Sequence, residues 1–119
     1  MAATFPKILI LILIFLGESL SIYAEMVGAK SNHLQTQPFW LIFWKMFLII
    51  TVAGGFLIAG YMLGFTTFNN IWIVSVISIT TILIVEPILA WTFFHQFPTK
   101  GALIGFILGA IGLFSAIFL

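Results

Sequence analysis

A carboxyl side chain, Glu18, stands in the middle of a long apolar segment near the start of the chain, between mostly apolar runs at residues 8–16 and 20–22. In lipid, a charged side chain at the centre of a spanning helix costs ~2.5–3.5 kcal/mol, so such residues usually face protein or a water-filled cavity. Removal from water stabilises the neutral, protonated form of a carboxyl group. Such a group can bind a proton from one side of the membrane and release it to the other. We therefore predict that Glu18 binds a proton or a substrate. The alternative is a protonated Glu18 that hydrogen-bonds a neighbouring helix.

Two further carboxyl groups lie in apolar segments. Glu25 shares a helical face with Glu18, but it lies nearer the membrane edge, where we expect a solvated interfacial charge. Glu86 precedes Pro87, which frees a backbone carbonyl one turn earlier and can bend a helix. Glu86 either lines a cavity at such a bend or joins two helices as a protonated group.

Two serines share the helical face of Glu86. Ser75 and Ser78 precede it at spacings that bring all three side chains to roughly one side of a helix. We therefore predict Ser75, Ser78 and Glu86 as proton-binding or substrate-binding residues together with Glu18.

Small residues recur at a spacing that brings helices together. The last apolar segment carries four glycines on nearly one face, at Gly101, Gly105, Gly109 and Gly112. Small residues at this spacing let helix backbones approach closely in a membrane. We predict that these glycines form a subunit interface, with packing inside the chain as the alternative. Gly60 and Gly64 repeat the spacing in the second apolar segment.

The elements that must position these side chains are transmembrane helices. The chain is 63% hydrophobic and only 6% charged, whereas a soluble domain carries about 25% charged residues. A spanning helix needs ~20 apolar residues, and four segments reach that length. The predicted fold is an all-α membrane protein with short connections, forming one transmembrane domain over 1–119 with helices at approximately 6–27, 39–65, 71–94 and 101–119.

The composition excludes several chemistries. The chain has no cysteine, so it forms no disulfide and no thiolate metal site, and two histidines without nearby carboxylates are a poor ligand set. It has no basic block for nucleic acid and no phosphate-binding loop, GxSxG or HExxH motif. We expect no enzyme activity, no cofactor, no metal and no nucleic-acid partner.

The lysines weakly indicate how the chain is oriented in the membrane. Lys7 falls on one side of the predicted membrane, and Lys30, Lys45 and Lys100 fall on the other. The positive-inside rule then places both chain ends outside the cytoplasm. Because the bias is only three to one, we also consider insertion in both orientations. The lipid bilayer is the expected environment, in a multi-pass protein of the cell (inner) membrane.

These features together resemble the small multidrug resistance proteins of the drug/metabolite transporter superfamily. Gly17-Glu18-Ser19 stands where that family carries an Ala-Glu pair, and residues 91–96 (Trp-Thr-Phe-Phe-His-Gln) are similar to its Trp-x-Phe-Phe-x-Gln ending. The glycine-rich stretch from Gly101 is similar to the fourth helix of the wider superfamily. Glu86-Pro87 is closer to the larger ten-helix (EamA-like) relatives.

The resemblance implies a role for each matching position. In the family, the first-helix Glu binds protons and substrate in turn, the chains work as antiparallel dimers, and the fourth helix supports the dimer contact. Glu18 would take the role of that Glu. Trp91 would take the position of the family Trp, and we therefore add it to the predicted proton-binding or substrate-binding residues. Ser75 and Ser78 fall opposite the Tyr and Trp that line the family's drug pocket, which argues against aromatic cations as substrates.

The sequence therefore predicts a proton-coupled half-transporter for a small organic or lipid-like substrate, acting as a homo- or heterodimer. One alternative is a non-catalytic accessory subunit of a larger membrane complex, docked through the glycine face. Another is a subunit of a flippase for lipid-linked sugars, as some four-helix relatives are.

Overall fold

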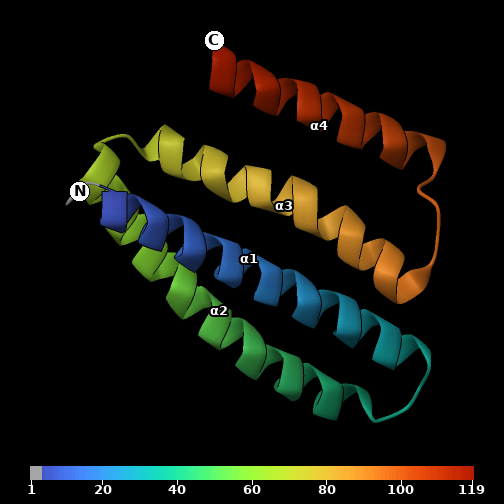
Figure 1. The fold of residues 1–119 in the computed structure, drawn as a ribbon. Helices are drawn as coiled ribbons and strands as arrows, with labels where there is room; N and C mark the ends of the chain where they lie inside the picture. Colours follow the sequence, from blue (N-terminus) through green and yellow to red (C-terminus); the bar gives the residue numbers. More distant parts are fainter. Residues whose placement is uncertain (1–3) are drawn as a thin grey trace.

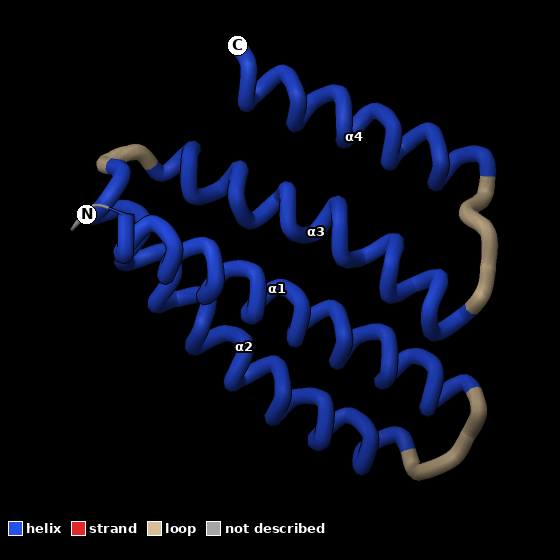
Figure 2. Tube along the Cα trace, in the orientation of Figure 1, coloured by secondary structure: helices blue, strands red, loops and turns tan. Residues whose placement is uncertain are grey.

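The computed structural model describes residues 4–119, which form four helices joined by short connections (Figures 1 and 2). The helices are α1 (Thr4–His33), α2 (Phe39–Phe68), α3 (Ile71–Phe94) and α4 (Lys100–Phe118). Each is long and apolar enough to cross a membrane. The predicted fold class, all-α with four spanning helices and short connections, is confirmed.

The first two helices are longer than the sequence predicted. The polar residues after Gly28 indicated a loop, but α1 continues to His33, and α2 continues three residues past Phe65 to Phe68. The helix passes through Gly28, and Met46 of α2 packs beside that position. The last turn of α1 carries Lys30 and His33, which suit the negative end of the helix dipole. A polar sequence therefore continues the helix beyond its apolar part.

Residues at the helix ends make the turns sharp. Asn69 closes α2 in the left-handed conformation (φ 55°), and the side chain of Asn70 accepts a hydrogen bond from the first turn of α3 at 2.9 Å. His95 (φ 53°) ends α3, so the helix is already closed when the chain reaches Pro98. Thr99 caps α4 by accepting a backbone N–H at 3.1 Å.

The helix α1 lies between α2 and α3 and packs most extensively against α2 (Figure 1). Four of its five buried positions recur at helical spacing, at Ile10, Ile14, Gly17 and Ala24, and the fifth is Ile22. Gly60 of α2 lies so close to α1 that a Cβ added there would approach Ile14 to 2.8 Å. Gly64 similarly faces Val74 of α3 at 2.8 Å. The predicted close approach at Gly60 and Gly64 is thus used inside the chain, in the three-helix core.

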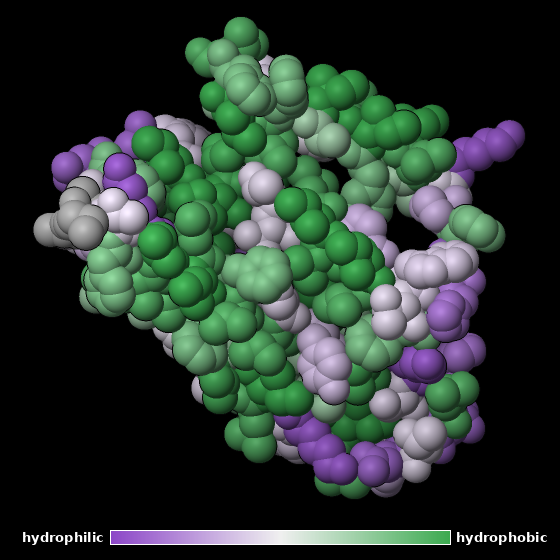
Figure 3. Space-filling model, in the orientation of Figure 1, coloured by the Kyte–Doolittle hydropathy of each residue, from purple (hydrophilic) through white to green (hydrophobic). Residues whose placement is uncertain are grey.

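The fourth helix stands apart from this core. It packs only against α3 among the described helices, and none of its residues is buried. Hydrophilic residues gather toward the two ends of the bundle and hydrophobic residues cover the middle, including the surface of α4 (Figure 3). The surface of α4 that does not face α3 is therefore apolar and open.

Candidate functional site

The candidate site is centred on Glu18, which the structure pairs with Ser78. Glu18 lies at the middle of α1 (Thr4–His33), and helical side chains lean toward the N-terminal end of their helix. The Ser78 hydroxyl of α3 donates a hydrogen bond to Oε1 of Glu18 at 2.5 Å. Ser78 is 5% exposed, whereas Glu18 remains partly exposed. One carboxyl oxygen of Glu18 is thus tied to α3, while the residue as a whole stays partly exposed.

The three acidic residues of the chain all lie on α1 and α3. Glu18 and Glu25 belong to α1, and Glu86 belongs to α3, which packs against α1. Glu25 is exposed and borders a cavity of about 300 Å³ between α1 and α2, while Glu86 is partly buried.

The carboxyl groups do not form a metal site. Across residues 4–119, no set of three or more His, Asp or Glu side chains is placed to hold a metal ion. A carboxyl group such as that of Glu18 can exchange a proton, accept hydrogen bonds and attract positive charge.

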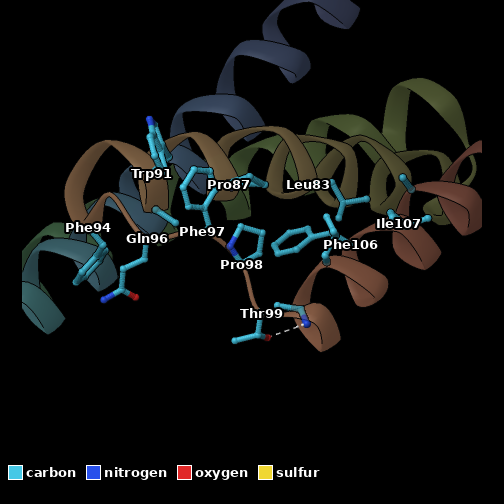
Figure 4. A pocket seen from close by; sticks show the side chains of 14 residues that line it. Leu83, Pro87, Trp91, Phe94, Gln96, Phe97, Pro98, Thr99, Phe106 and Ile107 are labelled. Atoms are coloured by element: carbon cyan, nitrogen blue, oxygen red, sulfur yellow. Dashed lines mark hydrogen bonds between the residues drawn. The ribbon is translucent and has the colours of Figure 1, made fainter.

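Ser75 lies close to this site, whereas Trp91 lies away from it. Ser75 is partly buried one turn before Ser78 on α3, close to the site along the helix. Trp91 instead borders the space between α3 and α4, with its ring 5.7 Å from the ring of His95 and 5.0 Å from that of Phe97 (Figure 4). Of the predicted binding residues, the structure brings Ser78 into contact with Glu18 and places Trp91 in another part of the molecule.

The structure also shows features that sequence reasoning missed. The Ser19 hydroxyl is buried without a hydrogen-bond partner in the described part of the chain, beside an apolar cavity of about 460 Å³ between α1 and α3. Another cavity, of about 670 Å³, lies between the second half of α3 and the first half of α4. Cavities arise from the spacing of helices, which no sequence motif reports. The position of Ser19 next to Glu18 was the one available signal.

The predicted interface glycines on α4 are largely free of contacts within the chain. A Cβ added at Gly101, Gly105 or Gly112 would meet no atom within 4 Å, whereas at Gly109 it would meet Leu83 of α3 at 3.5 Å. Packing inside the chain thus explains a small residue at Gly109 but not at Gly101, Gly105 or Gly112.

These observations define the class of the protein, a multi-pass integral membrane protein with four candidate transmembrane helices and lipid around them. No protein-family model, no curated protein and no solved structure matches this chain.

Proposed function

We propose that this chain is a half-transporter in which Glu18 binds protons and a small organic or lipid-like substrate in turn. Two chains, identical or paired with a sibling, form an eight-helix unit in the cell membrane. The Glu18 side chains of both face a shared central cavity. Rocking of the two halves exposes that cavity to each side of the membrane alternately.

The observation that carries this proposal is the placement of Glu18. It lies at mid-height in a spanning helix, partly exposed, with one oxygen hydrogen-bonded by Ser78. A carboxyl group at this depth is costly, and residues of this kind mark ion and substrate pathways. A purely structural carboxyl would be enclosed and fully hydrogen-bonded. Glu18 keeps accessible surface with which a second chain or a substrate can interact.

A second chain supplies what one chain lacks. Four helices enclose little space, and α4 covers only part of α3 without burying any residue of its own. The contact-free glycines of α4 (Gly101, Gly105 and Gly112) offer a close helix–helix contact to that partner. Two Glu18 carboxyl groups brought into one cavity would titrate as a coupled pair.

The same open α4 surface supports a second candidate function, that of an accessory subunit in a larger membrane complex. In that case Glu18 and Glu86 would serve structure alone. Purification separates the two functions. A stable dimer of this chain supports the transporter, and obligate co-purification with larger membrane proteins supports the accessory subunit.

The test of the transporter is the substitution Glu18→Gln in protein reconstituted into liposomes. With a pH gradient and an entrapped pH-sensitive dye, a panel of small organic compounds is screened for stimulated proton flux. We expect Glu18→Gln to abolish that flux, because an amide cannot carry the proton. The amide oxygen still accepts the hydrogen bond from Ser78, so the fold is retained.

The matched control is Glu25→Gln, which makes the same chemical change at an exposed position seven residues along α1. We expect this variant to keep most of the flux. Full coupled transport by Glu18→Gln would refute the assignment of Glu18 as the proton-binding residue.

A further inference from the structure

A cavity of about 670 Å³ lies between the second half of α3 and the first half of α4 (Figure 4). Its walls include Pro87 and Trp91 of α3 and Phe106 of α4, and Phe97 of the connection also borders it. The volume falls within the ~300–1,000 Å³ of small-molecule sites. We propose that this cavity binds an anionic membrane phospholipid, with an acyl chain between the two helices and the phosphate at Lys100.

The apolar walls select an acyl chain. Both bounding helices are candidate membrane spans, so the molecules next to the cavity are lipids. Because α4 contacts α3 alone among the described helices, no other helix of the chain closes the cavity from the side. An unfilled space of this size would forfeit the dispersion contacts of its lining atoms. A lipid chain entering from the bilayer restores those contacts without uncovering any polar group.

The polar end of the cavity selects an anionic headgroup. Gln96 and Thr99 border it where the connection joins α4. Lys100 follows directly and is exposed, and the first turn of α4 contains no acidic residue. Lys30, at the end of α1, and Lys45, near the start of α2, lie at this same end of the bundle. The end of the cavity bordered by Gln96 and Thr99 therefore lies at the end of the bundle where three of the four lysines lie. This placement complements the anionic lipids of a cytoplasmic leaflet.

This site is independent of the proposed transport function. It requires neither Glu18 nor a second chain, and it uses the face of α4 that points to α3. The glycines that are free of contacts remain available to a partner. A lipid site can therefore be present in a protein that does not transport, and the experiment below measures no transport.

The first experiment uses Trp91 as a reporter inside the cavity. In the variant used, Trp91 is kept and Trp40, Trp44 and Trp72 are changed to Phe. The variant is placed in phosphatidylcholine vesicles that contain a second lipid brominated on its acyl chains. This second lipid is phosphatidylglycerol in one set of vesicles and phosphatidylcholine in the other. Bromine quenches a tryptophan that it touches. We expect half-maximal quenching at about fivefold less brominated phosphatidylglycerol than brominated phosphatidylcholine, the ratio for the ~1 kcal/mol that one lysine contributes.

Matched variants locate the effect. Lys100→Gln should remove the preference while keeping the quenching, and Ala110→Phe, which fills the cavity from α4, should weaken quenching by both lipids. A variant keeping only Trp72, 76% exposed at the opposite end of α3, should be quenched equally by both lipids.

Native mass spectrometry of the unaltered chain gives an answer that does not depend on the tryptophan variants. After exposure to an equal mixture of the two lipids, one phosphatidylglycerol should remain bound per chain, and Lys100→Gln should lose it. Equal quenching of Trp91 by the two lipids would overturn the proposal. A preference that survives Lys100→Gln would do the same, as would a Trp91 shielded from both lipids by a second copy or another helix.

Discussion

Glu18 and Ser78 are 60 positions apart in the sequence, yet one hydrogen bond joins them. Helical spacing predicted each residue on a polar face of its own helix. It did not predict that the two faces meet, because the rotation of α1 against α3 is set by packing around Ile10, Ile14 and Val74. The sequence thus supplies the candidate residues of the site, and the core supplies their pairing.

Removing the Ser78 hydroxyl tests what this pair contributes to stability. Ser78→Ala leaves one Glu18 oxygen without its partner, and polar contacts between membrane helices average ~0.6 kcal/mol with a maximum near ~1.7. We expect the variant to lose about 0.6–1.7 kcal/mol, measured by reversible unfolding in mixed detergent micelles.

Thr51→Ala is the control for that measurement, since the Thr51 hydroxyl bonds only the Phe47 carbonyl of its own helix, at an exposed position. Equal losses for the two variants would mean that the contact between helices adds nothing to the stability of the bundle.

At the scale of the elements, the close pairing of α1 with α2 depends on small residues from both helices. A Cβ at Gly17 would lie 2.6 Å from Cγ of Leu57 and 3.0 Å from the backbone oxygen of Ala53. The sequence indicated glycine packing in α2 through Gly60 and Gly64, but Gly17 drew attention only as a neighbour of Glu18. Its packing role depends on which face of α1 turns toward α2, and four apolar helices leave that choice open.

Gly17→Ala should therefore separate α1 from α2. Overpacking a tight contact costs about 1–3 kcal/mol, which exceeds the ~0.5–1 kcal/mol gained when Ala replaces Gly inside a helix. We expect a net loss of unfolding free energy. Gly55→Ala makes the same change where no atom lies within 4 Å, and it should be neutral or stabilising. A stabilised Gly17→Ala variant would show that the two helices do not approach this closely.

The helix ends that the sequence predicted correctly are those with a local signal in the sequence. The predicted range of α3, residues 71–94, agrees with the structure because Asn70 and His95 mark its ends locally. The end of α1 was wrong by six residues, because hydropathy reports where the bilayer ends and a helix can continue into water. The cavity between α3 and α4 had no local signal at all.

At the scale of the whole molecule, α4 is attached to the bundle through α3 alone among the described helices. Gly101, Gly105 and Gly112 have open space beside them. The sequence predicted a subunit interface there, and this remains a prediction.

The substitution Gly105→Leu tests the predicted interface on α4. No atom of the chain lies where the new side chain begins, so the fold should be retained while a second chain is held away. We expect the dissociation constant of the dimer to rise about tenfold, a change of about 1.4 kcal/mol. Sedimentation in detergent measures this constant. Gly55→Leu is the control at an equally open position on α2. Unchanged dimerisation of Gly105→Leu, or equal weakening by both variants, would remove α4 from the interface.

The unequal lengths of the helices have a mechanical consequence. With 30 residues each, α1 and α2 measure about 45 Å, whereas the 19 residues of α4 measure about 28 Å. A hydrocarbon layer is ~30 Å thick, and a long helix adapts to a thinner layer by tilting, whereas a short one has no spare length for a thicker layer. Bilayer thickening therefore acts first on α4, the helix with the fewest neighbours. A thicker host membrane therefore strains the α3–α4 junction. Lipids that thicken the bilayer strain this junction before they disturb the three-helix core.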